Sequence, residues 1–385
     1  KGQNSREMYR KLCDDLHIEA PVRSRVQKAQ LPEVVEIHRA SDEVVDKAYR
    51  KLLDIKFFQL SDLHRENLHR RGFSDETIER NGYRSISADF PWVNRYRKAK
   101  EQYQKLIPSI RKDNILKRRT PERLIAGLIA ASILAKCGCE LRGVPGFFRI
   151  DGVWCFNLEP GMLIPTRNAV GQIVALQVRR DKPSDWNDYC KRTGQNKEFL
   201  RYMTISAKGL PDGVTTDISQ AHFPLGNDSL DDPETAVCIT EGPLKADAAG
   251  GFNRKMFFIA LHGTSNTKTL PAIFAWLKGK GVETVFNVFD MDKVTNVNVA
   301  KAGKRVRAIA AGCGIKLAEK CWDAEYAQQK LSELNAICCE HGIFVPTTFN
   351  VFTDLANVSQ ELAKRNIRHS RVKNADGLEE KHYWS

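Results

Sequence analysis

The chain has 385 residues, of which 42 % are hydrophobic and 28 % are charged. At about 100–200 residues per domain, this length predicts two or three domains that can each bury a core, and the charged fraction excludes wholesale disorder. No apolar run approaches the roughly 20 residues that a membrane-spanning helix needs, so the sequence predicts a soluble protein without a membrane partner. The formal net charge of +13 predicts an acidic partner, and nucleic acid is the first candidate.

The cysteine pattern predicts reduced thiols in a cytoplasm and no structural zinc. The ten cysteines form no regular framework. Three groupings have irregular spacing for a zinc ribbon: Cys13 with His17, Cys137 with Cys139, and Cys338–Cys339 with His341. Buried thiols are therefore the expected role of these cysteines.

The first 135 residues are predicted to be helical. Residues 1–56 mix charge with short helical patterns and indicate a helical extension without catalytic residues. In the region 57–135, Ser61 to Gly72 and Ser74 to Gly82 each predict a helix with serine at its start and glycine at its end, because these residues satisfy unpaired backbone groups there. A buried helix is expected at residues 121–135.

Residues 92–119 are strongly basic. Trp92, Tyr96 and Tyr103 are interleaved with the basic side chains, and only Glu101 and Asp113 oppose them. The cations are Arg95, Arg97, Lys98, Lys100, Lys105, Arg111, Lys112, Lys117, Arg118 and Arg119. The pattern indicates either a surface that tracks phosphates, with stacking side chains, or a solvated helical face.

The rest of the chain predicts one antiparallel and one parallel sheet. Residues 136–232 contain short apolar runs separated by Gly, Pro and Asp, which favour hairpins in a basic α+β subdomain. Residues 233–325 alternate between strands and helices, which predicts a parallel sheet with crossover helices. Residues 326–385 indicate two helices around a strand. The expected fold class is therefore α/β combined with α+β.

Three carboxylates follow the strands of the predicted parallel sheet. Glu241 ends the strand 236–241, and Asp290 and Asp292 end the strand 284–289. Carboxyl ends of parallel strands meet at the edge where open α/β sheets bind ligands. Hard oxygens so placed suit Mg²⁺, or Mn²⁺, together with substrate phosphates. The alternative is a set of solvent-exposed loop acids.

The motifs around these acids resemble the Toprim domain of DnaG-type primases. They read Ile-Thr-Glu-Gly-Pro-Leu-Lys-Ala-Asp, Ala-Leu-His-Gly-Thr and Val-Phe-Asp-Met-Asp. The upstream segments Leu-Ile-Pro-Thr-Arg and Leu-Arg-Tyr-Met-Thr-Ile-Ser are similar to strands of the primase core. The resemblance covers roughly residues 57–325 and extends most closely to primase-like Toprim proteins of phages, plasmids and integrative elements.

The resemblance implies primer synthesis on single-stranded DNA from nucleoside triphosphates, in a bacterial, phage or plasmid setting, with a separate helicase or replication protein. Glu241, Asp290 and Asp292 would hold the catalytic metal. Phosphates of template and nucleotide would contact basic residues and one tyrosine: Arg167, Arg179, Arg201, Tyr202, Lys245, Arg118 and Arg119. Two alternatives stay open: a metal-dependent Toprim nuclease, and a non-catalytic DNA-binding accessory protein.

Overall fold

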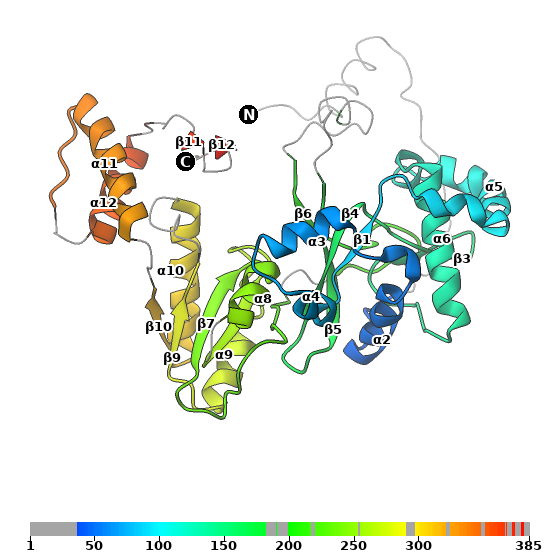
Figure 1. Cartoon of the computed structure of the whole chain (residues 1–385), viewed down its shortest axis with the longest axis horizontal. Helices are drawn as coiled ribbons and strands as arrows, with labels where there is room; N and C mark the ends of the chain where they lie inside the picture. The colour runs from blue at the N-terminus through cyan, green and yellow to red at the C-terminus, as the bar shows by residue number, and fades with distance from the viewer. Residues whose placement is uncertain are drawn as a thin grey trace, which may run out of the picture. The chain divides into compact units, whose positions relative to one another are not determined.

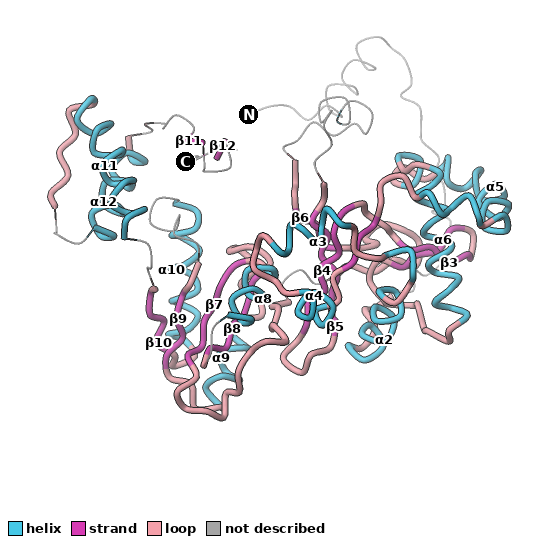
Figure 2. The backbone as a smooth tube through the Cα atoms, viewed as in Figure 1, coloured by secondary structure: helices cyan, strands magenta, loops and turns pink. Residues whose placement is uncertain are grey.

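Two four-stranded sheets carry the fold, one antiparallel and one parallel (Figures 1 and 2). The computed structural model describes residues 37–181, 190, 199–216, 220–252, 255–289, 297–320, 324–347, 351–365, 367, 372–373 and 379–380. The helical extension expected within residues 1–36 lies outside this range. None of the helices described there is long and apolar enough to cross a membrane.

The antiparallel sheet has the strand order β1-β4-β5-β6. Its strands are β1 (Arg84–Ile86), β4 (Gly161–Arg167), β5 (Ile173–Arg179) and β6 (Tyr202–Thr204). A separate hairpin joins β2 (Phe147–Ile150) to β3 (Val153–Phe156). The antiparallel hairpins expected in the region 136–232 are confirmed. All seven residues of β4 are buried, because β4 lies between two strands and packs on both faces.

Helices from the first part of the chain pack around this sheet and the β2–β3 hairpin. They are α2 (Asp42–Leu53), α3 (Asp62–His69), α4 (Asp75–Asn81), α5 (Arg97–Lys112) and α6 (Pro121–Lys136), with the short 3₁₀ turns η1 (Lys56–Phe58), η2 (Pro91–Arg95) and η3 (Leu116–Arg118). Helix α5 packs against α6 and β2. The Ser61 and Ser74 side chains accept hydrogen bonds from the backbone N–H groups of His64 and Thr77. Gly82 ends α4 at φ +73°, a left-handed conformation that glycine adopts without strain. Both predicted helices and their serine caps are thus confirmed, but only α4 ends at its predicted glycine, since α3 ends at His69 with Arg70 as its C-cap.

Helix α2 is part of the core rather than of an extension. Val45, Tyr49 and Leu52 are fully buried in the same apolar cluster as α6 and β5. The buried Tyr49 hydroxyl donates to the Pro145 carbonyl at 2.9 Å. The expected boundary at residue 56 therefore does not coincide with a break in packing, because amphipathic residues of α2 complete the cover of the sheet.

The parallel sheet has the strand order β10-β9-β7-β8. Its elements are β7 (Ala236–Glu241), α8 (Pro243–Phe252), β8 (Met256–Leu261), α9 (Leu270–Gly279), β9 (Thr284–Asn287), α10 (Val297–Gly312) and β10 (Lys316–Glu319). The predicted alternation of strands and helices is confirmed: β7 has its predicted ends, and β9 ends at Asn287 rather than at residue 289. Because β8 lies on one side of β7 and β9 on the other, the strand order reverses at β7, and ligands of open α/β sheets bind at the carboxyl ends of such strands.

The C-terminal region differs from its prediction in one element. Helices α11 (Ala324–Glu340) and α12 (Val351–Lys364) pack together, but the described connection 341–347 contains no strand. Ile343 instead packs into the helix pair, and its N–H donates to the Cys338 carbonyl at 2.8 Å, which ends α11. The short strands β11 (Val372–Lys373) and β12 (Glu379–Glu380) follow α12.

Candidate nucleotide-transfer site

Glu241 is the last residue of β7, and its side chain is 23 % exposed at the carboxyl edge of the parallel sheet. The next residue, Gly242, has φ +81° and donates its N–H to the Leu261 carbonyl at 2.8 Å, which turns the chain sharply into α8. Lys245 lies one turn into this helix, and its Nζ is 3.0 Å from Glu241 Oε1. The carboxylate is thus held at the sheet edge with a cation beside it.

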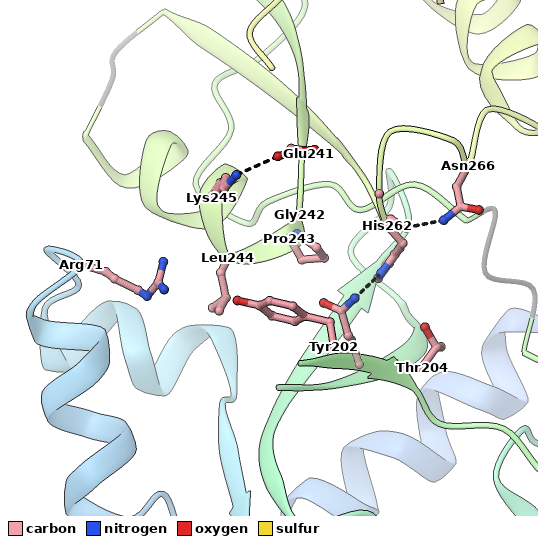
Figure 3. A pocket seen from close by; sticks show the side chains of 12 residues that line it. Arg71, Tyr202, Thr204, Glu241, Gly242, Pro243, Leu244, Lys245, His262 and Asn266 are labelled. Carbon is pink, nitrogen blue, oxygen red and sulfur yellow. Dashed lines mark hydrogen bonds and ion pairs between the residues drawn. The ribbon is translucent and has the colours of Figure 1, made fainter. Parts of the chain in front are cut away.

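Glu241 and Lys245 line a cavity of about 490 Å³ to which both sheets contribute (Figure 3). Tyr202 and Thr204 of β6 lie across from them, and Arg71 reaches the cavity from the turn after α3. The Tyr202 side chain is 42 % exposed. The cavity therefore combines an acid, two cations and an accessible aromatic ring at the strand end where a ligand is expected.

His262, which follows β8, forms a neutral wall of this cavity. The Gln177 amide nitrogen donates to His262 Nδ1 at 3.1 Å, so Nε2 carries the proton and donates to Thr166 Oγ1 at 2.9 Å. Burial, with a smaller contribution from His222, lowers the pKa of His262 to about 4. The imidazole is therefore uncharged near neutral pH and binds the antiparallel sheet to the carboxyl end of β8.

A buried polar network joins the two sheets behind the cavity; we call Tyr83, Arg167, His222 and Asp247 the junction network. The His222 backbone pairs with Ala260 of β8, with both bonds at 2.8 Å. His222 Nδ1 accepts the Arg167 backbone N–H at 3.1 Å, which leaves Nε2 to donate to Asp247 Oδ1 at 3.0 Å. The Tyr83 hydroxyl donates to Asp247 Oδ2 at 2.5 Å. These bonds connect β4, β8, α8 and the end of α4.

Arg167 belongs to this network and not to a phosphate-binding surface. Its side chain is buried at 3 % exposure, and Nη2 donates to the Asn81 carbonyl at 2.9 Å. Burial lowers the pKa of the guanidinium, while Asp247 and Tyr83 partly oppose that shift. The structure therefore places the Arg167 side chain in the interior, whereas the sequence predicted it on a surface that contacts template or nucleotide.

The remaining predicted basic residues fall into two groups. Arg179 and Tyr202 are paired across the β5–β6 ladder, and the carbonyl of the exposed Arg201 accepts a 2.7 Å hydrogen bond from the Arg180 N–H. The structure thus brings three predicted residues together, with Tyr202 at the cavity. Arg118 and Arg119 lie elsewhere, at η3. Arg119 is half-buried and donates to the Asn157 side chain, and burial lowers its pKa to about 10.

Asp290 and Asp292 lie outside the described residues. The last described residue before them, Phe289, is buried, and the preceding Val288 donates its N–H to the Ile239 carbonyl of β7 at 2.8 Å. Within the described residues, no group of three or more His, Cys, Asp or Glu side chains could hold a metal ion. Glu241 alone fits as one oxygen ligand, since it is partly accessible at a cavity.

Five cavity residues with polar side chains were not predicted as site residues: Arg71, Gln177, Thr204, His262 and Asn266. Arg71 and Thr204 come from distant segments, so no local pattern could have placed them there. The place of His262 at the sheet edge could have been predicted, because it directly follows a predicted strand of the parallel sheet. Asn266 also binds back to this strand end, since its side-chain amide donates to the His262 carbonyl.

The chain matches no protein-family model and no curated protein. It is similar to the solved structure of the Aquifex aeolicus primase (zinc-binding and RNA polymerase domains), with 11 % identity and a TM-score of 0.40 over 93 % of this chain and 65 % of that chain, which is less than two thirds. The RNA polymerase domain of the Mycobacterium tuberculosis primase DnaG has 13 % identity and a TM-score of 0.40 over 85 % of this chain and 88 % of that chain.

A third structure, a DnaG primase catalytic domain bound to ssDNA, has 15 % identity and a TM-score of 0.40, and the match covers 78 % of each chain. At these identities and TM-scores the likenesses do not establish the family. The proposal below therefore rests on the cavity and the strand ends.

Proposed function

We propose that the chain is a Toprim-type nucleotidyltransferase that synthesises primers on single-stranded DNA. The observation that carries the proposal is the position of Glu241. It ends β7 at the reversal of strand order and lines a cavity of about 490 Å³ with Lys245, Arg71 and Tyr202. The neighbouring strand β9 runs parallel to β7 and precedes the sequence Asp290-Met291-Asp292.

The cavity residues can perform the steps that nucleotide transfer needs. Arg71 and Lys245 would bind the triphosphate, and Tyr202 would stack on a base. A 3′-hydroxyl attacks the α-phosphorus, the new P–O bond forms, and pyrophosphate leaves. Glu241 would accept the hydroxyl proton or hold the metal ion. Mg²⁺ or Mn²⁺ bound by Glu241, Asp290 and Asp292 would supply charge neutralisation for the phosphates.

The proposal also assigns a template path and partners. Arg179 and Arg201 beside the cavity would bind the phosphates of the single-stranded template. The segment Gly263 to Thr269 lacks the second glycine of a nucleotide-hydrolysing P-loop, so a separate helicase or replication protein would unwind the duplex. Replication of a phage, plasmid or integrative element is the setting in which we place this activity.

Primer synthesis on single-stranded circles, with ribo- or deoxyribonucleotides, tests the proposal. We expect Glu241→Gln, and the pair Asp290→Asn with Asp292→Asn, to reduce Mg²⁺-dependent synthesis by about 10³-fold or more while DNA binding stays within about twofold. Glu140→Gln, which changes an exposed acid after α6, is the matched control. Synthesis by the double-acid variant at the native rate would overturn the site assignment, and shortening of a labelled strand without nucleotides would indicate a nuclease.

The Glu241–Lys245 ion pair favours one second candidate, a nucleic-acid-binding module without catalysis. At 3.0 Å the ammonium lies beside the carboxylate oxygen that a metal ion would use. This candidate predicts DNA binding that depends on salt but not on Mg²⁺, and no extension of any primer. The synthesis assay separates the two candidates.

A further inference from the structure

The solvent side of α5 and the adjoining turns form a strongly basic surface, which we call the basic face. Residues 95–118 contain nine Lys or Arg residues against two acids, so this segment supplies an excess of seven positive charges, more than half of the net charge of the chain. The nine cations are Arg95, Arg97, Lys98, Lys100, Lys105, Arg111, Lys112, Lys117 and Arg118.

The packing of α5 turns these cations outward. Leu106 and Ile110 are buried in the apolar cluster that α5 shares with α6 and β2, and Tyr103 packs against the same cluster. Because the helical repeat is 3.6 residues, the cations of α5 fall on the opposite side. Eight of the nine are exposed, and only Lys100 is half-buried. The basic face thus runs along the whole of α5.

Very little negative charge compensates the basic face. Within the described parts of the chain, the ion pair found for these cations is Arg97 with Glu101 at 3.4 Å. The Asp113 carboxylate instead accepts the N–H groups of Ile115 and Leu116 at 2.7 and 2.8 Å, which caps η3. Lys100 and Lys117 donate to neutral asparagine side chains.

The aromatic residues of this segment are engaged with one another. The Trp92 ring stacks on Phe57 with centroids 4.1 Å apart, and Tyr96 meets both rings edge-on. Trp92 is half-buried against the core cluster of the antiparallel sheet. In this structure the Trp92 ring is thus packed on protein rings, and the basic face is described by its charge alone.

We propose that the basic face binds the sugar–phosphate backbone of a nucleic acid, at a place separate from the cavity. A 16-residue helix is about 24 Å long, which spans several phosphates of a strand whose charges are about 3.4 Å apart. An anionic membrane would need a row of large apolar side chains beside the cations. The exposed residues of α5 include none, and in the described adjoining turns only the large apolar side chains of Tyr96 and Ile115 are exposed, at 36 % and 39 %. No residue of α5 lines the cavity, so the proposed binding does not depend on nucleotide transfer in the cavity.

Four neutralising substitutions and a matched control test the proposal. The test variant carries Lys98→Gln, Lys105→Gln, Arg111→Gln and Lys112→Gln. The control carries Lys47→Gln, Lys51→Gln, Lys136→Gln and Arg142→Gln, which remove the same charge from exposed positions on α2, at the end of α6 and after α6. Glutamine is a good helix former, so α5 should persist, and circular dichroism of both variants checks this.

The readout is the affinity for a fluorescent 20-nucleotide single strand across a series of salt concentrations. We expect the test variant to bind about tenfold more weakly at 0.1 M salt, and the slope of log affinity against log salt to fall by about 3, since each lost phosphate contact removes about 0.7. The control should keep the native slope.

Equal losses in both variants would overturn the proposal, because only net charge would then matter. Native affinity in the test variant would also overturn it. A third contrary result would be native oligonucleotide binding together with loss of binding to vesicles of anionic lipid, which would make the basic face a membrane surface.

Discussion

The junction network and the basic face both contain arginine, but it is buried and hydrogen-bonded in the first and exposed in the second. Arg167 is 3 % exposed, and its guanidinium lies within a network that contains Asp247 and the Asn81 carbonyl. Arg111 and Arg118 are exposed and have no acidic partner within the described residues. The comparison teaches that burial and pairing decide what an arginine does. A basic residue near a functional motif can be structural, and one far from it can bind a ligand.

Physical chemistry explains why each region is built as it is. Burying a charge is costly unless it is paired and hydrogen-bonded, so the junction network requires several groups from different elements at fixed distances. This requirement sets the position of β4 relative to β8, and with it the walls of the cavity. Arg167 Nε is the one buried guanidinium nitrogen of this network without a hydrogen-bond partner among the described residues. Water solvates the cations of the basic face, so their positions can follow the helical repeat alone.

The largest effect should follow from removing the centre of the junction network. Asp247→Leu leaves the Tyr83 hydroxyl and His222 Nε2 without their shared acceptor in a buried site. We expect the free energy of unfolding, measured in urea, to fall by about 3–5 kcal/mol. Tyr83→Phe removes only one donor and should lower it by about 1–3 kcal/mol. Unchanged stability in both variants would show that the network does not join the sheets.

A smaller effect should follow from lowering the pH. Burial lowers the pKa of His262 from 6.5, its ordinary value, to about 4 in the folded state. The unfolded state therefore binds more protons between these values, so stability is complete above pH 6.5 and falls as the pH drops toward 4, by up to about 3 kcal/mol. Urea unfolding at pH 7 and pH 5 measures this loss. His262→Gln should flatten the dependence, and an equally steep loss in that variant would assign it to another group.

Much of the fold follows from local patterns. The caps at Ser61 and Ser74, the turn at Gly82 and the strand patterns of the parallel sheet each depend on a few neighbouring residues, and the structure confirms them. The strand expected between the two C-terminal helices is absent from the described residues 341–347, since the apolar run at Ile343 fits a strand and a buried connection equally well. Only its packing between α11 and α12 decides the question.

Less of the candidate site than of the fold could be predicted from the sequence. Glu241 could be placed because parallel strands end at a common edge. The cavity also needs Arg71 and Tyr202, which are far from Glu241 in sequence and meet it only through the junction of the two sheets. For Arg167 the sequence shows a basic residue at a strand end but not the direction of its side chain, which the structure places in the interior.

Substituting the buried arginine should separate its structural role from nucleic-acid binding. Arg167→Gln removes the donor to the Asn81 carbonyl and leaves Asp247 with less neutralising charge. We expect a loss of about 1–3 kcal/mol in the free energy of unfolding and no change in the salt dependence of DNA binding. A reduced salt slope with native stability would instead place the Arg167 side chain in contact with phosphates.

The smallest expected effect on stability comes from the converse substitution, Arg111→Gln on the basic face. The side chain is exposed and the change should alter the free energy of unfolding by no more than about 0.5 kcal/mol. The salt slope of single-strand binding should nevertheless fall by about 0.7, because one phosphate contact is lost. Both variants should be measured in the same buffers. Arg167→Gln should lower the free energy of unfolding and keep the salt slope, whereas Arg111→Gln should lower the salt slope and keep the free energy of unfolding. A destabilised Arg111→Gln protein with a native salt slope would remove the distinction between the two regions.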